Sequence, residues 1–194
     1  MIAWSLMLIT LLLPEPTSAA NARSELKELT VAPAGSLDGY SHLRFMPEWA
    51  EEVGMCDSRE IVLHRDATEI TTGWDCSAIQ GTWYSRYDGK TLHSEAEIDV
   101  DHLVPLSNAW RSGARAWTDA QRYSFANDLI RPELIAVSES ANLDKGGRSP
   151  ISWRPRKDYW CTYARAWITV KHHYRLTVTE NEKRALAEML GACA

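Results

Sequence analysis

The sequence predicts one exported α+β domain that is stabilised by disulfide bonds. Three observations favour this class: an apolar start followed by an ordinary globular composition, two short strand-like segments separated by a long helical region, and four cysteines after the apolar start. The chain has 194 residues, of which 45% are apolar and 24% are charged. A chain of this length and composition is typical of a single globular domain.

The first residues have the pattern of a secretory signal peptide. The segment IAWSLMLITLLL carries no charge, and small residues follow it around Ala19 to Ala22. Such a leader is too short to span a bilayer comfortably; the alternative is a buried N-terminal helix. We therefore expect residues 1–22 to form a signal peptide, residues 23–55 an extension and residues 56–194 the functional domain, secreted and without a membrane segment in its mature form.

The cysteines agree with export, because their number is even and they contain no CxxC pair that would suggest zinc. They are Cys56, Cys76, Cys161 and Cys193. Three pairings are possible, and we favour the local one, Cys56 with Cys76 and Cys161 with Cys193. In the chain-entropy picture each bond stabilises the fold by roughly 3–4 kcal/mol.

The expected secondary structure places two strands on either side of a helical region. Hydrophobic periodicity and turn residues predict, in order, a helix at 56–67, a hairpin at 81–93, a strand at 96–100, helices after Pro105, a strand at 133–137, a helix at 138–147, an amphipathic helix at 156–174 and a last helix that begins at Thr179. Strand, strand and helix form a compact frame that can hold a metal ion.

Residues that suit phosphodiester hydrolysis occur at the ends of these elements. Asp101 and His102 lie where the first strand stops, while Asn142 and Lys145 lie three residues apart on one face of the helix that follows the second strand. An imidazole suits a general base at neutral pH. Carboxylate and amide oxygens suit Mg²⁺ or Mn²⁺ rather than zinc, and a lysine can add positive charge near a phosphate.

The strand geometry raises one objection to this site. Adjacent residues on a regular strand face opposite sides, so Asp99 and Asp101 share a face and His102 points away. The set converges only if the strand bends at its end, which Val104 and Pro105 favour. Asp99 therefore remains an alternative metal ligand.

A basic segment follows the candidate site, although the whole chain has a net charge of −5. Residues 143–175 hold eight Lys or Arg against two acidic residues, a balance of +6, which leaves −11 for the remainder. Basic residues interleaved with tryptophan suit a phosphate backbone and stacked bases; the alternative is a solvated helix face. The candidate substrate contacts are Arg148, Trp153, Arg154, Arg156 and Lys157.

The segments DVDHLVP, FANDL and SANLDKG, in this order, resemble the HNH (His-Me finger) nucleases, and are most similar to the C-terminal domain of GmrSD-type restriction endonucleases. The resemblance implies a ββα-metal core with additional helices and a small N-terminal hairpin region. It also implies His102 as general base, Asp101 and Asn142 as metal ligands, Lys145 near the phosphate, and Asn127 bracing the loop that holds the histidine. Products with 5′-phosphate and 3′-hydroxyl ends are expected.

We therefore expect a monomeric endonuclease of low sequence specificity that acts on nucleic acid, DNA before RNA, with Mg²⁺ or Mn²⁺. One alternative is a non-catalytic secreted binding or effector protein that retains the fold. A second is a glycan hydrolase that uses paired carboxylates such as Glu97 and Asp101. A glycosidase needs no metal ion, so sensitivity to EDTA distinguishes the two enzymes.

Overall fold

The computed structural model describes residues 16–193, so most of the predicted signal peptide lies outside the described residues. Within this range the fold is a mixed α+β domain, as predicted. Its α-helices are α1 (Ala19–Glu28), α2 (Ser58–Asp66), α3 (Leu106–Arg111), α4 (Asp119–Ala126), α5 (Glu139–Lys145), α6 (Trp160–His173) and α7 (Glu180–Leu190). Short 3₁₀ helices are η1 (His42–Arg44), η2 (Glu95–Glu97), η3 (Ala114–Ala116) and η4 (Lys157–Tyr159).

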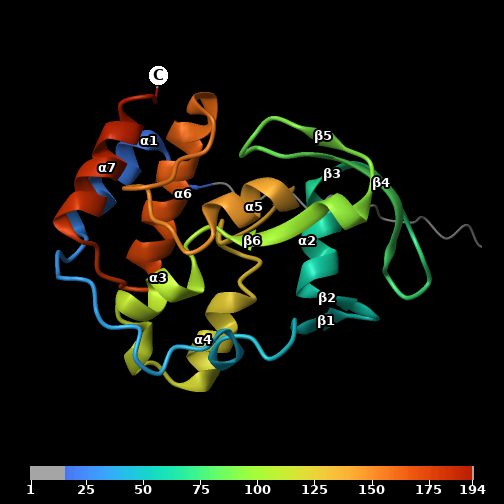
Figure 1. Ribbon diagram of the computed structural model, residues 1–194, viewed down its shortest axis with the longest axis horizontal. Helices are drawn as coiled ribbons and strands as arrows, with labels where there is room; N and C mark the ends of the chain where they lie inside the picture. Colours follow the sequence, from blue (N-terminus) through green and yellow to red (C-terminus); the bar gives the residue numbers. More distant parts are fainter. Residues whose placement is uncertain (1–15, 194) are drawn as a thin grey trace, which may run out of the picture.

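The strands form three small antiparallel sheets. They are β1 (Glu51–Val53) with β2 (Cys56–Asp57), then β3 (Ala67–Thr72), β4 (Ala78–Tyr84) and β5 (Thr91–Leu92), and finally β6 (Ile98–His102) with β7 (Leu134–Ser138). Figure 1 shows α1, α6 and α7 gathered on one side of the molecule and the β3–β4–β5 sheet on the other, with β6 and α5 between them.

The β6, β7 and α5 elements follow the expected strand–strand–helix order. Ser138 caps α5 by accepting a hydrogen bond from the Ala141 N–H, and Gly146 ends the helix with a φ of 49°, a conformation that favours glycine. The chain between the two strands contains α3, η3 and α4. The long helical insertion predicted from the sequence therefore lies between two strands that pair directly.

The expected helix at 56–67 ends one residue early, and a strand that we did not predict follows it. Asp57 and Glu60 form a capping box at the start of α2, and the helix ends at Asp66. The next six residues, ATEITT, form β3 against β4. β-Branched residues in this segment favour an extended chain, but its alternation is too short to separate it from the preceding helix.

Helix α6 lies at the centre of the main core. Its Tyr163, Trp167 and Val170 side chains are fully buried, and α1 and α7 pack against it. Phe45, from the predicted extension, is also fully buried and packs against Phe125. Residues 23–55 and residues 56–193 therefore share one hydrophobic core.

The segment where we expected signal cleavage is helical in this structure. Ser18 caps α1 by accepting a hydrogen bond from the Asn21 N–H at 3.2 Å, and Ala22 is fully buried. Ala22 and Leu26 are the buried residues of this helix, and cleavage of a signal peptide after residue 22 stays a prediction. Among residues 16–193, no helix is long and apolar enough to cross a membrane.

Both disulfide bonds have the local pairing that the sequence favours. Cys56–Cys76 joins β2 to the turn between β3 and β4, with 5.2 Å between the Cα atoms. Cys161–Cys193 joins the start of α6 to the segment after α7, with 4.9 Å between the Cα atoms. Each bond closes a loop and restricts the unfolded chain, which stabilises the fold.

Candidate active site at the end of β6

Strand β6 runs straight to its last residue, so it does not bend as the sequence-based site required. Asp101 pairs with Ile135 and His102 pairs with Leu134 in regular antiparallel register. The Asp99 and Asp101 side chains contact side chains of α5, whereas the His102 side chain contacts residues outside α5. The carboxylates and the imidazole thus lie on opposite faces of the strand, as its alternation requires.

Asp101 and Lys145 form a buried ion pair. The Lys145 ammonium lies 2.9 Å from Oδ1 and 2.8 Å from Oδ2 of Asp101, and it also donates to the His102 carbonyl at 2.8 Å. Tyr87 donates its hydroxyl to Asp101 Oδ2 at 2.6 Å. Burial raises the pKa of Asp101 above its usual value, while the Lys145 ammonium acts in the opposite direction.

This arrangement corrects two expectations. Lys145 is fully buried, so its ammonium binds Asp101 instead of reaching a phosphate at the surface. Both oxygens of Asp101 are already bound, and an ammonium occupies the position next to the carboxylate that a divalent ion needs. The pair instead attaches α5 to β6 through charge-assisted hydrogen bonds.

Asn142 contacts Asp99, the alternative ligand, rather than Asp101. The Asn142 Nδ2 donates to Asp99 Oδ2 at 2.9 Å. The Oδ1 atoms of Asp99 and Asn142 accept no hydrogen bond from any other described residue. These two partly exposed oxygens fit a Mg²⁺-type ion, which takes hard oxygen ligands and keeps several waters.

No group of three or more His, Cys, Asp or Glu side chains within residues 16–193 is arranged to hold a metal ion. The Asp99–Asn142 pair supplies one carboxylate and one amide, so it has fewer than three ligating side chains. Two protein ligands are compatible with Mg²⁺, because substrate phosphates and water complete its octahedral coordination.

His102 is held rigidly in a nearly buried position. Its Nε2 lies 2.8 Å from the carbonyl oxygen of Ala126, and a carbonyl can only accept, so Nε2 carries the proton. Its ring stacks on Trp49, with 5.8 Å between ring centroids and 3° between planes. The Nδ1 lone pair is therefore available to accept a proton.

The environment of His102 keeps the imidazole neutral. Burial lowers the pKa of His102 to about 4, and the positive charges of Lys145 and His42 add to this effect. The hydrogen bond to Ala126 acts in the opposite direction. At neutral pH the ring is consequently in the form that a general base requires.

Asn127 braces the turn that presents the Ala126 carbonyl to His102. Its Oδ1 accepts from the Ala50 N–H at 2.9 Å, and its Nδ2 donates to the Tyr123 carbonyl at 3.0 Å. The first bond also fixes the chain next to Trp49. Asn127 therefore connects both supports of the imidazole.

Glu133 fixes the chain where β6 ends. Its carbonyl accepts from the Leu103 N–H at 2.7 Å, and its Oε2 accepts from the Val104 N–H at 3.1 Å. Glu133 is fully buried, and burial raises its pKa well above the usual value. We did not predict Glu133, Trp49 or Tyr87 as site residues, because all three lie outside the motif segments.

The basic segment is mostly engaged within the protein. Arg148 and the indole N–H of Trp153 both bind Asp144, and Trp153 is buried. Arg154 forms two hydrogen bonds to Glu188. We expected Arg148, Trp153 and Arg154 to contact substrate, and in this structure they bind acidic side chains of the protein itself.

The other two expected substrate contacts lie at the surface. Arg156 donates to the Tyr84 hydroxyl at 2.7 Å and pairs with Asp158 at 2.7 Å. Lys157 is exposed, and its ammonium has no partner among the described residues. Arg156 and Lys157 are exposed, as is Arg148, but the Lys157 ammonium is the group among these three without a partner in residues 16–193.

Comparison with known proteins identifies the family. Residues 64–189 match the C-terminal domain of GmrSD restriction endonucleases, so the chain belongs to this family of HNH-type nucleases. The chain is 51% identical over 181 residues to a protein of Arthroderma benhamiae described as an uncharacterized secreted protein, covering 93% of this chain and 88% of the relative. No solved structure matches significantly.

The family match spans α2 to α7 and includes His102, Asn127 and Asn142. Nucleases of the HNH type generally use divalent metal ions. Trp49 and Ala50, which support His102, precede the matched segment. The candidate site therefore combines family residues with supports from the N-terminal part of the chain.

Proposed function

We propose that the protein is a secreted, metal-dependent endonuclease that hydrolyses phosphodiester bonds of DNA or RNA with low sequence specificity. One observation carries the proposal: a neutral, fixed imidazole at His102 ends the first strand of a strand–strand–helix unit in a nuclease family. The two disulfide bonds and the secreted relative support export, because such bonds persist in oxidising compartments.

His102 acts as the general base in this proposal. Its Nδ1 takes a proton from water as the water oxygen attacks phosphorus, the bond from phosphorus to the 3′ oxygen breaks, and the leaving 3′ oxygen takes a proton from solvent water. His102 then releases its proton to solvent. The Ala126 carbonyl fixes the tautomer throughout this step. The imidazole is neutral at pH 7, and its lowered pKa of about 4 makes it a weaker base than an ordinary histidine.

The cation is Mg²⁺ or Mn²⁺ and is held by Asn142 and Asp99, which replaces the ligand first expected, Asp101. When bound, such an ion stabilises negative charge on phosphate oxygens as a Lewis acid. Asp101 and Lys145 then have a different role, which is to hold α5 against β6 so that Asn142 stays beside Asp99. This division gives each acidic residue of β6 a separate function.

The second candidate is a non-catalytic secreted binding protein that retains the fold. The complete internal pairing of Asp101 with Lys145 and Tyr87 favours this alternative, because those groups then serve stability alone. It predicts nucleic-acid binding or protein binding without turnover. The two candidates differ in one observable, namely whether substrate is cleaved in the presence of a divalent ion.

The test is nicking of supercoiled plasmid, with single-stranded DNA and RNA run in parallel. The purified, oxidised protein is assayed in Mg²⁺ or Mn²⁺ at low salt, because backbone binding weakens steeply with salt. We expect cleavage that EDTA abolishes and that His102→Ala reduces by at least about a hundredfold. His93→Ala, which removes an exposed histidine, is the matched control. Absence of cleavage of all three substrates by folded protein favours the binding protein.

A further inference from the structure

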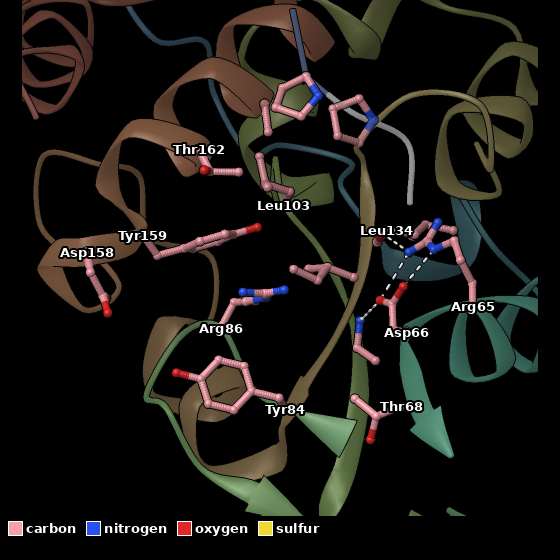
Figure 2. Close-up of a pocket in the computed structure, with 15 residues that line it drawn as sticks. Arg65, Asp66, Thr68, Tyr84, Arg86, Leu103, Leu134, Asp158, Tyr159 and Thr162 are labelled. Atoms are coloured by element: carbon pink, nitrogen blue, oxygen red, sulfur yellow. Dashed lines mark hydrogen bonds and ion pairs between the residues drawn. The ribbon is translucent and has the colours of Figure 1, made fainter. Parts of the chain in front are cut away.

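A pocket of about 330 Å³ lies along the outer edge of β7, away from the Asp99–Asn142 pair. Its walls come from the end of α2, the segment after β4, the edge of β7 and the start of α6, as Figure 2 shows. Pro16 closes one side. None of the roles proposed above uses this pocket.

The free edge of β7 in this pocket is closed to another strand. The Leu134 carbonyl accepts from Arg65 Nη2 at 2.7 Å, and the Ala136 N–H donates to Asp66 Oδ2 at 2.8 Å. The two side chains thus take the place of a neighbouring strand, which is a way of protecting a sheet edge. An extended peptide that adds to β7 is therefore not the expected ligand.

The pocket presents positive charge. Arg86 is exposed, extends into the pocket in Figure 2, and lies over the Tyr84 ring at 5.4 Å without an acidic partner among the described residues. Arg65 also lines the pocket, is about nine-tenths buried, and has an Nη1 without a hydrogen-bond partner. Arg86 is therefore the guanidinium group that is open to a ligand in this pocket, whereas the Arg65 guanidinium is buried against Asp66 and the Leu134 carbonyl.

The acidic residues of the pocket are already paired. Asp66 binds Arg65 through both carboxylate oxygens. Asp158 pairs with Arg156, 2.7 Å away at the rim. With both acids neutralised in this way, Arg86 supplies the uncompensated charge of the pocket.

The start of α6 adds a second anion-binding feature. Thr162, in the first turn of α6, lines the pocket, and no side chain caps this helix. A helix N-terminus carries partial positive charge, although here the 3₁₀ helix η4 precedes α6 and the Trp160 N–H donates to the Lys157 carbonyl. The hydrogen-bond donors for an oxyanion are therefore Arg86 and the Thr162 hydroxyl.

We propose that this pocket binds a phosphate group, either of a nucleotide or of a nucleic-acid strand. The pocket lies at the same end of β6 as the candidate base, because Leu103, next to His102, and Leu134, paired with His102, both line it. In the strand form, which rests on the proposed function, the bound phosphate is a neighbour of the one that is cleaved. Binding itself does not depend on catalysis.

The experiment measures binding by NMR in EDTA, where no hydrolysis occurs. Inorganic phosphate, a nucleoside monophosphate and a short single-stranded oligonucleotide are titrated separately into the oxidised protein. The variants are Arg86→Gln and, as matched control, Arg115→Gln, which removes an exposed arginine outside the pocket. Backbone amide shifts at Arg86, Thr162 and Leu134 report occupancy of the pocket.

We expect saturable shifts at these residues, and Arg86→Gln to weaken binding by about fivefold while Arg115→Gln changes it little. Tighter binding of the oligonucleotide identifies a strand phosphate, whereas tighter binding of the monophosphate identifies a free nucleotide. Absence of saturable shifts with all three compounds, or equal weakening in both variants, overturns the proposal. Because these titrations contain no metal ion, their outcome is independent of whether the protein cleaves nucleic acid.

Discussion

Trp49 stacks on His102, with the two ring planes 3° apart and their centroids separated by 5.8 Å. Trp49 precedes the segment that matches the family, yet it touches the residue to which we assign the central chemical role. The neighbouring Ala50 N–H binds Asn127, which also holds the turn containing Ala126. The N-terminal part of the chain therefore contacts the imidazole directly through Trp49 and restricts its orientation.

Trp49→Ala should lower kcat by about tenfold and leave KM almost unchanged, because the imidazole loses its orientation while substrate contacts remain. Trp49→Phe keeps an aromatic face and should recover most of the loss. Steady-state kinetics on an oligonucleotide substrate measure both values. A rise in KM at constant kcat would instead mean that Trp49 binds substrate.

Lys145→Met should destabilise the fold by roughly 3–5 kcal/mol, because it leaves the Asp101 carboxylate buried and unpaired. The double variant Lys145→Met with Asp101→Asn should be less destabilised, since no buried charge remains. Urea denaturation of the two single variants and the double variant forms a mutant cycle. Additive effects of the two substitutions would show that the pair is not coupled.

Asp99→Ala should raise the Mn²⁺ concentration needed for half-maximal cleavage by about tenfold. The substitution removes one of the two oxygen atoms that we propose as metal ligands. Asp101→Asn should change this concentration much less, after correction for the folded fraction. Metal titrations of the cleavage rate give both values. The reverse order of the two effects would restore Asp101 as the metal ligand.

Acid should destabilise the protein through His102. The pKa of this group is about 4 in the folded state, below its unfolded value near 6.5, so the unfolded state binds more protons between these values. Stability therefore falls as pH decreases through this window, by about 2 kcal/mol between about pH 7 and about pH 5 from this group. Urea denaturation at both pH values should show a smaller loss in His102→Asn than in the exposed-histidine control His93→Asn.

Local patterns predicted much of the fold around the site. Alternation and the DVDHLVP motif predicted β6, and Ser138 with the glycine pair predicted the limits of α5. We missed β3 because its six residues, five of them β-branched or polar, follow a helix without a turn signal. Short strands of this kind are defined by their partner strand rather than by their own sequence.

The contacts within the site depended on tertiary structure. Residue types predicted a general base, two ligands for one cation and a bracing asparagine. Strand alternation, however, places His102 on the opposite face of β6 from the carboxylates. Lys145 was expected at a phosphate because its spacing places it near Asn142, yet a fully buried ammonium needs a carboxylate beside it. Tyr87 and Trp49 carry no motif, so their contacts with Asp101 and His102 could be seen only in the folded chain.

The central claim is that His102 accepts a proton from water, and chemical rescue of His102→Ala tests it most directly. Removing this ring leaves a space beside Trp49 and the Ala126 carbonyl that free imidazole can fill. We expect His102→Ala to be nearly inactive in Mn²⁺. Added imidazole should restore cleavage at a rate proportional to the concentration of neutral imidazole. Full activity of His102→Ala without imidazole would contradict the assignment of His102 as the base.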